Sequence, residues 1–221
     1  MATATAAIQD YSKALYALES RGDGEPIGTN ALALRLGVTP GSVSAMLKKL
    51  DELHLVSHSP YRGVQLTEEG RRLALEVLRH HRLLELYLAE QLNIPWDRVH
   101  AEAEVLEHVL SEELEAAIAE KLGHPTVDPH GDPIPSVELT IDEPDTLSLD
   151  KLSLGCGARF VRVSDSDPEM LRFLSERGIA PGALLRVEER QPFDGPLYVA
   201  LEDRTEILGA NLARAMRVEL C

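Results

Sequence analysis

Imidazole and carboxylate side chains recur in the middle of the chain at a spacing that places them on one face of a helix. If residues 98–122 form one helix, at 100° per residue, four such side chains fall at about 340°, 0°, 40° and 80°. They are Glu107, His100, Glu104 and His108. Apolar residues occupy the wheel from about 140° to 320°, so the four border an apolar half. Because partly buried charge is costly unless a cation offsets it, the pattern predicts a metal site.

Two neighbouring helices add further candidate ligands. His81 and Glu85 are one turn apart on a helix predicted over residues 68–91, and Asp10 lies on a helix predicted over residues 8–19. Imidazole together with carboxylate suits a divalent transition metal. The only cysteines, Cys156 and Cys221, are too few for a cysteine zinc site or a disulfide scaffold.

Two other interpretations of these residues stay open on the sequence. The acidic positions could be a solvated face of a winged-helix protein that binds a partner protein. They could also form a two-metal hydrolytic centre of an enzyme, although the sequence shows no obvious nucleophile. The remaining histidines are not assigned as ligands, since His80 is expected at the surface and the others fall in wing or loop positions. These others are His54, His58, His124 and His130.

The first third of the chain has the pattern of a winged helix. A short helix over residues 31–36 stops at Gly37, and Thr39-Pro40 opens a second helix, which together form a helix-turn-helix. Two strand-like runs, 55–58 and 64–66, flank a turn-rich loop. In a winged helix the second helix enters the major groove and the wing meets the backbone or minor groove. The residues expected to contact DNA are Thr39, Ser42, Val43, Ser44, Lys48, Tyr61 and Arg62.

The charge of the chain is unevenly distributed. The 221 residues include 22 basic and 37 acidic side chains, which give a net charge of −15. Residues 1–72 are neutral overall, with eight of each sign, so a nucleic-acid surface is expected there and cation binding in the acidic middle, residues 73–124. No apolar run reaches the roughly 18 residues of a membrane helix and no signal peptide is visible, which predicts a cytoplasmic protein without a membrane partner.

These patterns predict a mainly α fold with a β part, organised in four segments. Strand-like runs, a hairpin signal at Asp194-Gly195 and one helix over residues 168–177 indicate a small five-stranded β-barrel at the end of the chain. The apolar half of the helix predicted over residues 98–122 is wider than one neighbour needs, which favours a homodimer interface. The predicted segments are a winged-helix DNA-binding domain (1–72), a helical metal-binding and dimerisation domain (73–124), a proline-rich tether (125–150) and the barrel (151–221).

The order of these parts resembles the diphtheria-toxin-repressor family of metal-dependent transcriptional regulators. The resemblance covers essentially the whole chain. Its most specific segments are residues 79–85 (RHHRLLE), residues 99–109 (VHAEAEVLEHV) and the DPIP sequence at residues 132–135. It implies a homodimer that binds operator DNA when loaded with metal.

The resemblance also implies two metal sites. One would use Asp10, Glu104, Glu107 and His108. The other would use His81, Glu85, His100 and an acidic group from the barrel, for which Asp167 and Glu169 lie near the matching place.

The ligand types bear on which metal is implied. The iron-responsive branch has Met at the position of Asp10 and Cys at that of Glu104, whereas two carboxylates match the manganese branch. Hard oxygen ligands favour Mn²⁺, with an Fe²⁺-responsive regulator as the alternative. Lys13 departs from the pattern, because manganese regulators without the barrel can place a second acid there.

Overall fold

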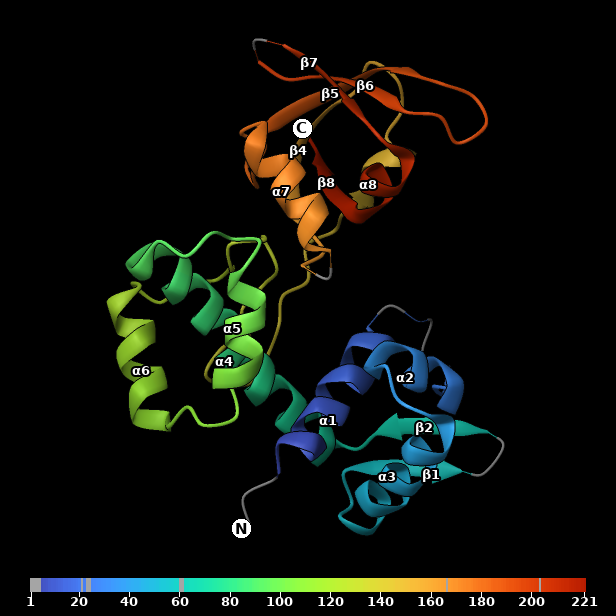
Figure 1. The fold of residues 1–221 in the computed structure, drawn as a ribbon, viewed down its shortest axis with the longest axis vertical. Helices are drawn as coiled ribbons and strands as arrows, with labels where there is room; N and C mark the ends of the chain where they lie inside the picture. Colours follow the sequence, from blue (N-terminus) through green and yellow to red (C-terminus); the bar gives the residue numbers. More distant parts are fainter. Residues whose placement is uncertain (1–4, 21, 23–24, 60–61, 166, 203) are drawn as a thin grey trace. The chain divides into compact units, whose positions relative to one another are not determined.

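The computed structural model describes residues 5–20, 22, 25–59, 62–165, 167–202 and 204–221. Figure 1 shows the fold, and the contacts of the chain divide it into two compact units. The first unit consists of Met1–His81, Glu104–Glu115 and Pro135–Thr140, and the second of Arg82–Ala103, Ala116–Ile134 and Ile141–Cys221. The four segments expected from sequence, with boundaries at residues 72, 124 and 150, stay a prediction.

The first unit contains the predicted winged helix. Gly37, at φ +66°, ends one helix, and the side chain of Thr39 caps the next by accepting a hydrogen bond from the Ser42 amide. The two strands of the wing are antiparallel, with Val56 opposite Leu66. The elements are α1 (Ala6–Glu19), α2 (Thr29–Leu36), α3 (Pro40–Glu52), β1 (Val56–Ser59) and β2 (Gly63–Leu66).

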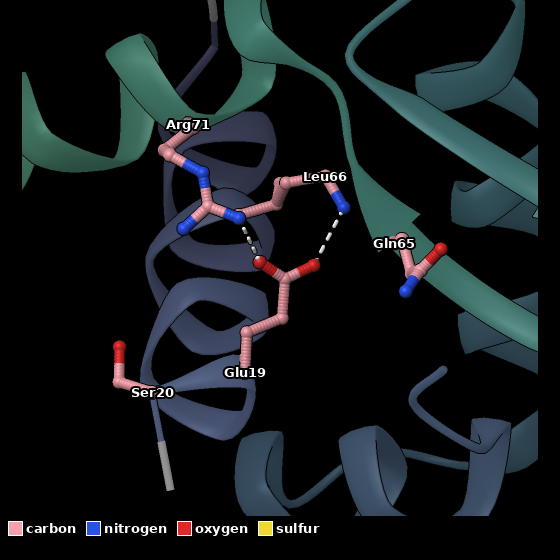
Figure 2. Close-up of a pocket in the computed structure, with 5 residues that line it drawn as sticks. All are labelled: Glu19, Ser20, Gln65, Leu66 and Arg71. Atoms are coloured by element: carbon pink, nitrogen blue, oxygen red, sulfur yellow. Dashed lines mark hydrogen bonds and ion pairs between the residues drawn. The ribbon is translucent and has the colours of Figure 1, made fainter. Parts of the chain in front are cut away.

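The C-terminal end of α1 is hydrogen-bonded to the wing and to the helix that follows the wing, α4 (Glu68–Leu92). Glu19 accepts a hydrogen bond from the Leu66 amide at 2.7 Å and another from Arg71 at 2.6 Å (Figure 2). The Glu19 side chain is only 12% exposed. Because both carboxylate oxygens are engaged, a displacement of α1 must also displace β2 or break these bonds.

The helix predicted over residues 98–122 is wrong as a single element. The structure has α5 (Val99–Leu106) and α6 (Glu112–Lys121), separated by a turn that includes Glu107 and His108. The Ser111 side chain accepts a hydrogen bond from the Leu114 amide at the start of α6, and α6 has glutamates in its first turn. Serine followed by acidic residues is a helix-start signal, and it outweighs the continuing apolar period.

The second unit is built around a six-stranded antiparallel sheet in the order β3-β8-β4-β5-β6-β7. Its core includes Phe160 and Val218 from the sheet and Leu171 from α7. In the part of the chain that the structure describes, the sheet ends at β3 and β7, so the predicted closed barrel is not confirmed. The elements are β3 (Leu147–Ser148), η1 (Leu149–Lys151), β4 (Gly157–Val163), α7 (Pro168–Glu176), β5 (Leu184–Arg190), β6 (Leu197–Ala200), β7 (Thr205–Leu208), α8 (Ala210–Ala215) and β8 (Met216–Leu220).

The coarse fold class is confirmed: the N-terminal part is mainly helical and the C-terminal part is a β-sheet domain. Sequence patterns did not predict β3 or α8, which are among the shorter elements of this part. Among the helices that the structure describes, none combines the length and apolar character needed to cross a membrane.

Candidate metal centres

The first cluster lies in the first unit and joins α1 to the turn after α5. The Nε2 atom of His108 is 3.1 Å from Oδ1 of Asp10, and its Nδ1 atom is 2.8 Å from Oε1 of Gln9. Ligand atoms of Asp10, Glu107 and His108 all lie within 4.8 Å of one another. Oδ1 of Asp10 is buried and accepts no hydrogen bond from any residue that the structure describes. A bound cation would satisfy that oxygen, so the residues present fit a metal ion.

Glu107 is the most deeply buried carboxylate of this cluster. Its side chain is 0% exposed, and it accepts hydrogen bonds from Lys13 at 2.6 Å and from Nδ1 of His81. Burial by itself would raise the pKa of Glu107, but the bond from His81 and the charge of Lys13 outweigh burial and lower it. Burial raises the pKa of Asp10, against the opposing effect of His108 and Lys13. The cluster therefore contains one carboxylate held as an anion and one that is poorly compensated.

The second cluster lies in the second unit. Nδ1 of His100, on α5, is 3.2 Å from Glu85 on α4 and 3.1 Å from Asp165 in the loop after β4. Their ligand atoms lie within 4.8 Å of one another. Hydrogen bonds to Asp165 and Glu85 raise the pKa of His100 to about 10. Two acids and one imidazole at this spacing can bind a divalent cation once the imidazole loses its proton.

The acidic group in this cluster is not one of the two that the sequence indicated. The carboxylate of Asp167 accepts hydrogen bonds from the amides of Glu169 and Met170 at 3.0 and 3.3 Å and so caps α7. Glu169 is exposed. Asp165, two residues earlier, is missed by sequence reasoning. The sequence did contain a signal for Asp165. Asp167, directly before Pro168, is the aspartate expected to cap the helix, which leaves Asp165 as the acid available for a metal.

A third group of potential ligands lies deeper in the second unit. Glu85, Asp128 and His130 are 0%, 5% and 0% exposed, and Nδ1 of His130 is 3.6 Å from Oε2 of Glu85. Burial raises the pKa of Asp128 to about 8. Burial opposes protonation of His130, but the nearby Glu85 carboxylate outweighs this and raises the pKa of His130 to about 9. His130 was expected in a loop and outside any metal site; it lies in a turn, but it is buried beside Glu85, a position that allows a ligand role.

His80 and His81 are both buried, although a surface position was expected for His80. Nε2 of His80 is 3.0 Å from Glu115, and its Nδ1 is 3.2 Å from the carbonyl oxygen of Glu107. Within its unit His81 contacts Glu107 and, at 3.7 Å, Glu104. The role of His81 in the second ligand set stays a prediction.

The expected DNA-contacting residues divide into exposed and buried ones. Val43 is 0% exposed, so it cannot touch DNA; it shares the buried face of α3 with Leu47 and Leu50. The spacing of these three, four and three residues apart, already marked that face. Tyr61 lies outside the described residues. The exposed members of the set are Thr39, Ser42, Ser44, Lys48 and Arg62.

Known families match all three parts of the chain. The model of the iron-dependent repressor N-terminal DNA-binding domain matches residues 3–64, that of the iron-dependent repressor metal-binding and dimerisation domain matches residues 67–136, and the FeoA domain matches residues 147–220. The iron-dependent repressor IdeR of Mycobacterium tuberculosis is 32% identical over 221 aligned residues, which cover 95% of each chain. The chain belongs to the diphtheria-toxin-repressor family.

Other members of the diphtheria-toxin-repressor family are similar over the same length. The diphtheria toxin repressor of Corynebacterium glutamicum is 32% identical and aligned over 95% of this chain and 94% of its own. A solved manganese-dependent transcriptional repressor in complex with manganese is 40% identical, with a TM-score of 0.90 over 97% of this chain and all of that one. The manganese regulator SloR is 29% identical, with a TM-score of 0.77 over 97% and 98%.

This membership decides between the broad classes of function. Members of the family are metal-dependent transcriptional repressors, so the hydrolytic-enzyme alternative is not supported. The matched models assign DNA binding to the first part of the chain and metal binding with dimerisation to the middle. The geometry of the two clusters bears on two finer questions: to which metal this chain responds, and which residues hold that metal.

Proposed function

We propose that the chain is a manganese-responsive repressor that binds operator DNA as a metal-loaded homodimer. The observation that carries this proposal is the donor set of the first cluster. Asp10, Glu107 and His108 converge there, with Glu104 beside them, and none of these donors is sulfur. Hard oxygen donors suit Mn²⁺, whereas Fe²⁺ gains more from softer ones. Manganese-dependent repressors among the similar structures support the same choice.

Two metal sites follow from the two clusters. Asp10, Glu104, Glu107 and His108 would hold one ion. Glu85, His100 and Asp165 would hold another, with Asp128 and His130 beside Glu85 as additional donors and His81 one turn before Glu85 on α4. A bound ion supplies positive charge that compensates buried carboxylates.

Helix α1 links the first cluster to the DNA-binding surface. Asp10 lies near its start and Glu19 at its end, where Glu19 holds the wing through the Leu66 amide. Asp10, Glu107 and His108 would hold the cation together, and its positive charge would fix α1 against that turn. Metal binding then favours the conformations in which the wing and α3 are positioned to bind DNA. The population shifts because these conformations bind the metal more tightly than the others do.

The proposed homodimer places two winged helices on one duplex. Exposed Lys48 on α3 and Arg62 at the wing would contact phosphates, and the two half-sites would lie about one helical turn apart. Apolar side chains of α5, the following turn and α6 are exposed in the first unit, and we assign the dimer contact to them. They are Val105, Leu106, Val109 and Leu114.

The test is DNA binding as a function of free metal concentration. A palindromic duplex is first selected from fragments of the genome that encodes the protein. Its fluorescence anisotropy is then measured anaerobically with Mn²⁺, Fe²⁺ or chelator. We expect tight binding with Mn²⁺, weaker binding with Fe²⁺ and none with chelator. In the Asp10→Met/Glu104→Cys variant the preference should shift toward Fe²⁺. Equal affinity with metal and with chelator would refute the proposal, and an unchanged metal order in the variant would refute the assignment to manganese.

A further inference from the structure

Gln9 contacts one nitrogen of the His108 imidazole, and Asp10 faces the other. The Oε1 atom of Gln9 is 2.8 Å from Nδ1 of His108, whereas Nε2 of the same ring is 3.1 Å from Oδ1 of Asp10. Gln9 and Asp10 are consecutive residues of α1, and both are half-buried. Two neighbouring side chains of one helix therefore contact the two nitrogens of one ring.

These two contacts differ in their chemistry. The amide oxygen of Gln9 can only accept a hydrogen bond, so Nδ1 of His108 carries the hydrogen that it donates. In the neutral imidazole, which is the form that binds metal, Nε2 then holds the lone pair. Oδ1 of Asp10 accepts no hydrogen bond from any residue that the structure describes, although Nε2 lies near it. Nε2 and Oδ1 are thus two electron-pair donors that face each other, as they would around one cation.

The orientation of the His108 ring depends on such a contact. His108 lies in the turn after α5, outside any helix, and its side chain is 15% exposed. A ring turned by half a rotation about its bond to Cβ would place carbon atoms where Nδ1 and Nε2 now lie, and the bond to Gln9 would be lost. That bond therefore favours the orientation in which Nε2 faces Asp10 and is 3.7 Å from Oε1 of Glu107.

We propose that Gln9 is a positioning residue of the first cluster: its hydrogen bond fixes the orientation and the tautomer of His108, so that Nε2 is directed at the metal. This inference rests on the proposed function, because it requires that His108 binds metal. An acceptor on the second ring nitrogen also raises the basicity of the nitrogen that binds the metal. The Gln9 amide supplies this acceptor without adding a negative charge to the carboxylates of the cluster.

The first measurement determines the tautomer in the metal-free, full-length protein. Long-range proton–nitrogen correlation spectra of isotope-labelled histidine, recorded where the rings are neutral, distinguish the two tautomers, and the His108 signals are those that vanish in His108→Ala. We expect the hydrogen on Nδ1 in the wild type and in Gln9→Glu, which keeps an acceptor oxygen. Gln9→Leu, which removes the acceptor, should move hydrogen to Nε2, where Asp10 can accept it. The matched control Gln91→Leu replaces an exposed glutamine of α4 and should resemble the wild type.

The second measurement is calorimetric titration of the same proteins with Mn²⁺. Loss of the acceptor in Gln9→Leu should weaken Mn²⁺ binding roughly 10- to 100-fold, the usual effect of removing the hydrogen-bond partner of an imidazole ligand. Gln9→Glu and Gln91→Leu should bind Mn²⁺ at least as tightly as the wild type.

Three results would overturn the inference. They are a hydrogen on Nε2 in the wild type, unchanged Mn²⁺ affinity in folded Gln9→Leu, and a loss of affinity in Gln9→Glu as large as that in Gln9→Leu. Failure of the proposed function has a different signature, because His108→Ala would then bind Mn²⁺ with the number of sites and the affinity of the wild type.

Discussion

Metal binding in the second unit should release protons, and the number released identifies which residues are ligands. His100 and His130 have pKa values raised to about 10 and about 9, and that of Asp128 is raised to about 8. All three groups are therefore protonated in the metal-free protein at pH 7. A metal binds neutral imidazole and ionised carboxylate, so every one of them that joins the coordination must first lose its proton.

The direction and size of the pH effect follow from these values. Because the folded-state pKa values lie above neutrality, raising the pH removes competing protons and increases the apparent affinity for Mn²⁺. If His100 is the only one of the three to lose a proton, the affinity rises about tenfold per pH unit between pH 6 and 8. If His130 also coordinates, the rise is about a hundredfold per unit, and Asp128 adds up to another factor of ten per unit below about pH 8.

The assay is calorimetric titration of Mn²⁺ at pH 6, 7 and 8, in pairs of buffers that differ in ionisation enthalpy. The Glu107→Gln background weakens the first cluster so that the second dominates the heat. His130→Gln should lower the number of protons released per Mn²⁺ bound by one if His130 coordinates the metal. It should leave that number unchanged if only Glu85, His100 and Asp165 coordinate it. An affinity that does not change between pH 6 and 8 would refute the reasoning, because it would mean that no protonated group is displaced.

Three further predictions concern the α7 cap, the α1–wing contact and the DNA surface. Asp167→Ala should lower the free energy of unfolding by about 1 kcal/mol in urea denaturation through loss of the α7 cap, with Mn²⁺ affinity unchanged. Asp165→Asn should weaken Mn²⁺ binding and leave the free energy of unfolding unchanged. Weakened Mn²⁺ binding in Asp167→Ala would contradict the assignment of Asp165. Glu19→Ala leaves the Leu66 amide without its acceptor, so it should cost about 1–3 kcal/mol of stability and weaken DNA binding in saturating Mn²⁺, with Mn²⁺ affinity retained; equal DNA affinity would exclude transmission through this contact. Lys48→Ala should lower the slope of log affinity for DNA against log salt concentration by about one, whereas the control Lys121→Ala should leave that slope unchanged.

The parts of the fold that sequence predicted are those specified by local signals. Gly37 must adopt a positive φ, and Thr39 with Pro40 favours a helix start, so the helix-turn-helix follows from a few neighbouring residues. The first ligand cluster was predicted from side-chain types and the family resemblance. The wheel that placed Glu107 and His108 on a helix was wrong, because the cap at Ser111 begins a new helix.

The residues that sequence missed depend on contacts between distant segments. Asp165 meets His100 across 65 positions of the chain, and His130 meets Glu85 across 45, and neither pair has a periodic signature. His130 is fixed by hydrogen bonds of its own backbone and ring to Asp128 and Trp96. Such contacts are set by tertiary packing, which composition and spacing do not encode.

Trp96 gives the second unit an optical property. It is the only tryptophan of the chain, its ring stacks on that of His130 at a centroid distance of 5.6 Å, and its carbonyl oxygen lies 2.8 Å from Nε2 of the same histidine. Glu85 directs Oε1 toward His100 and Oε2 toward His130, so the same carboxylate adjoins both imidazoles. A charged imidazole ring quenches a stacked indole more strongly than a neutral one. The emission of a single intrinsic fluorophore thus reports the protonation of a buried histidine one carboxylate away from the second cluster, without any added label.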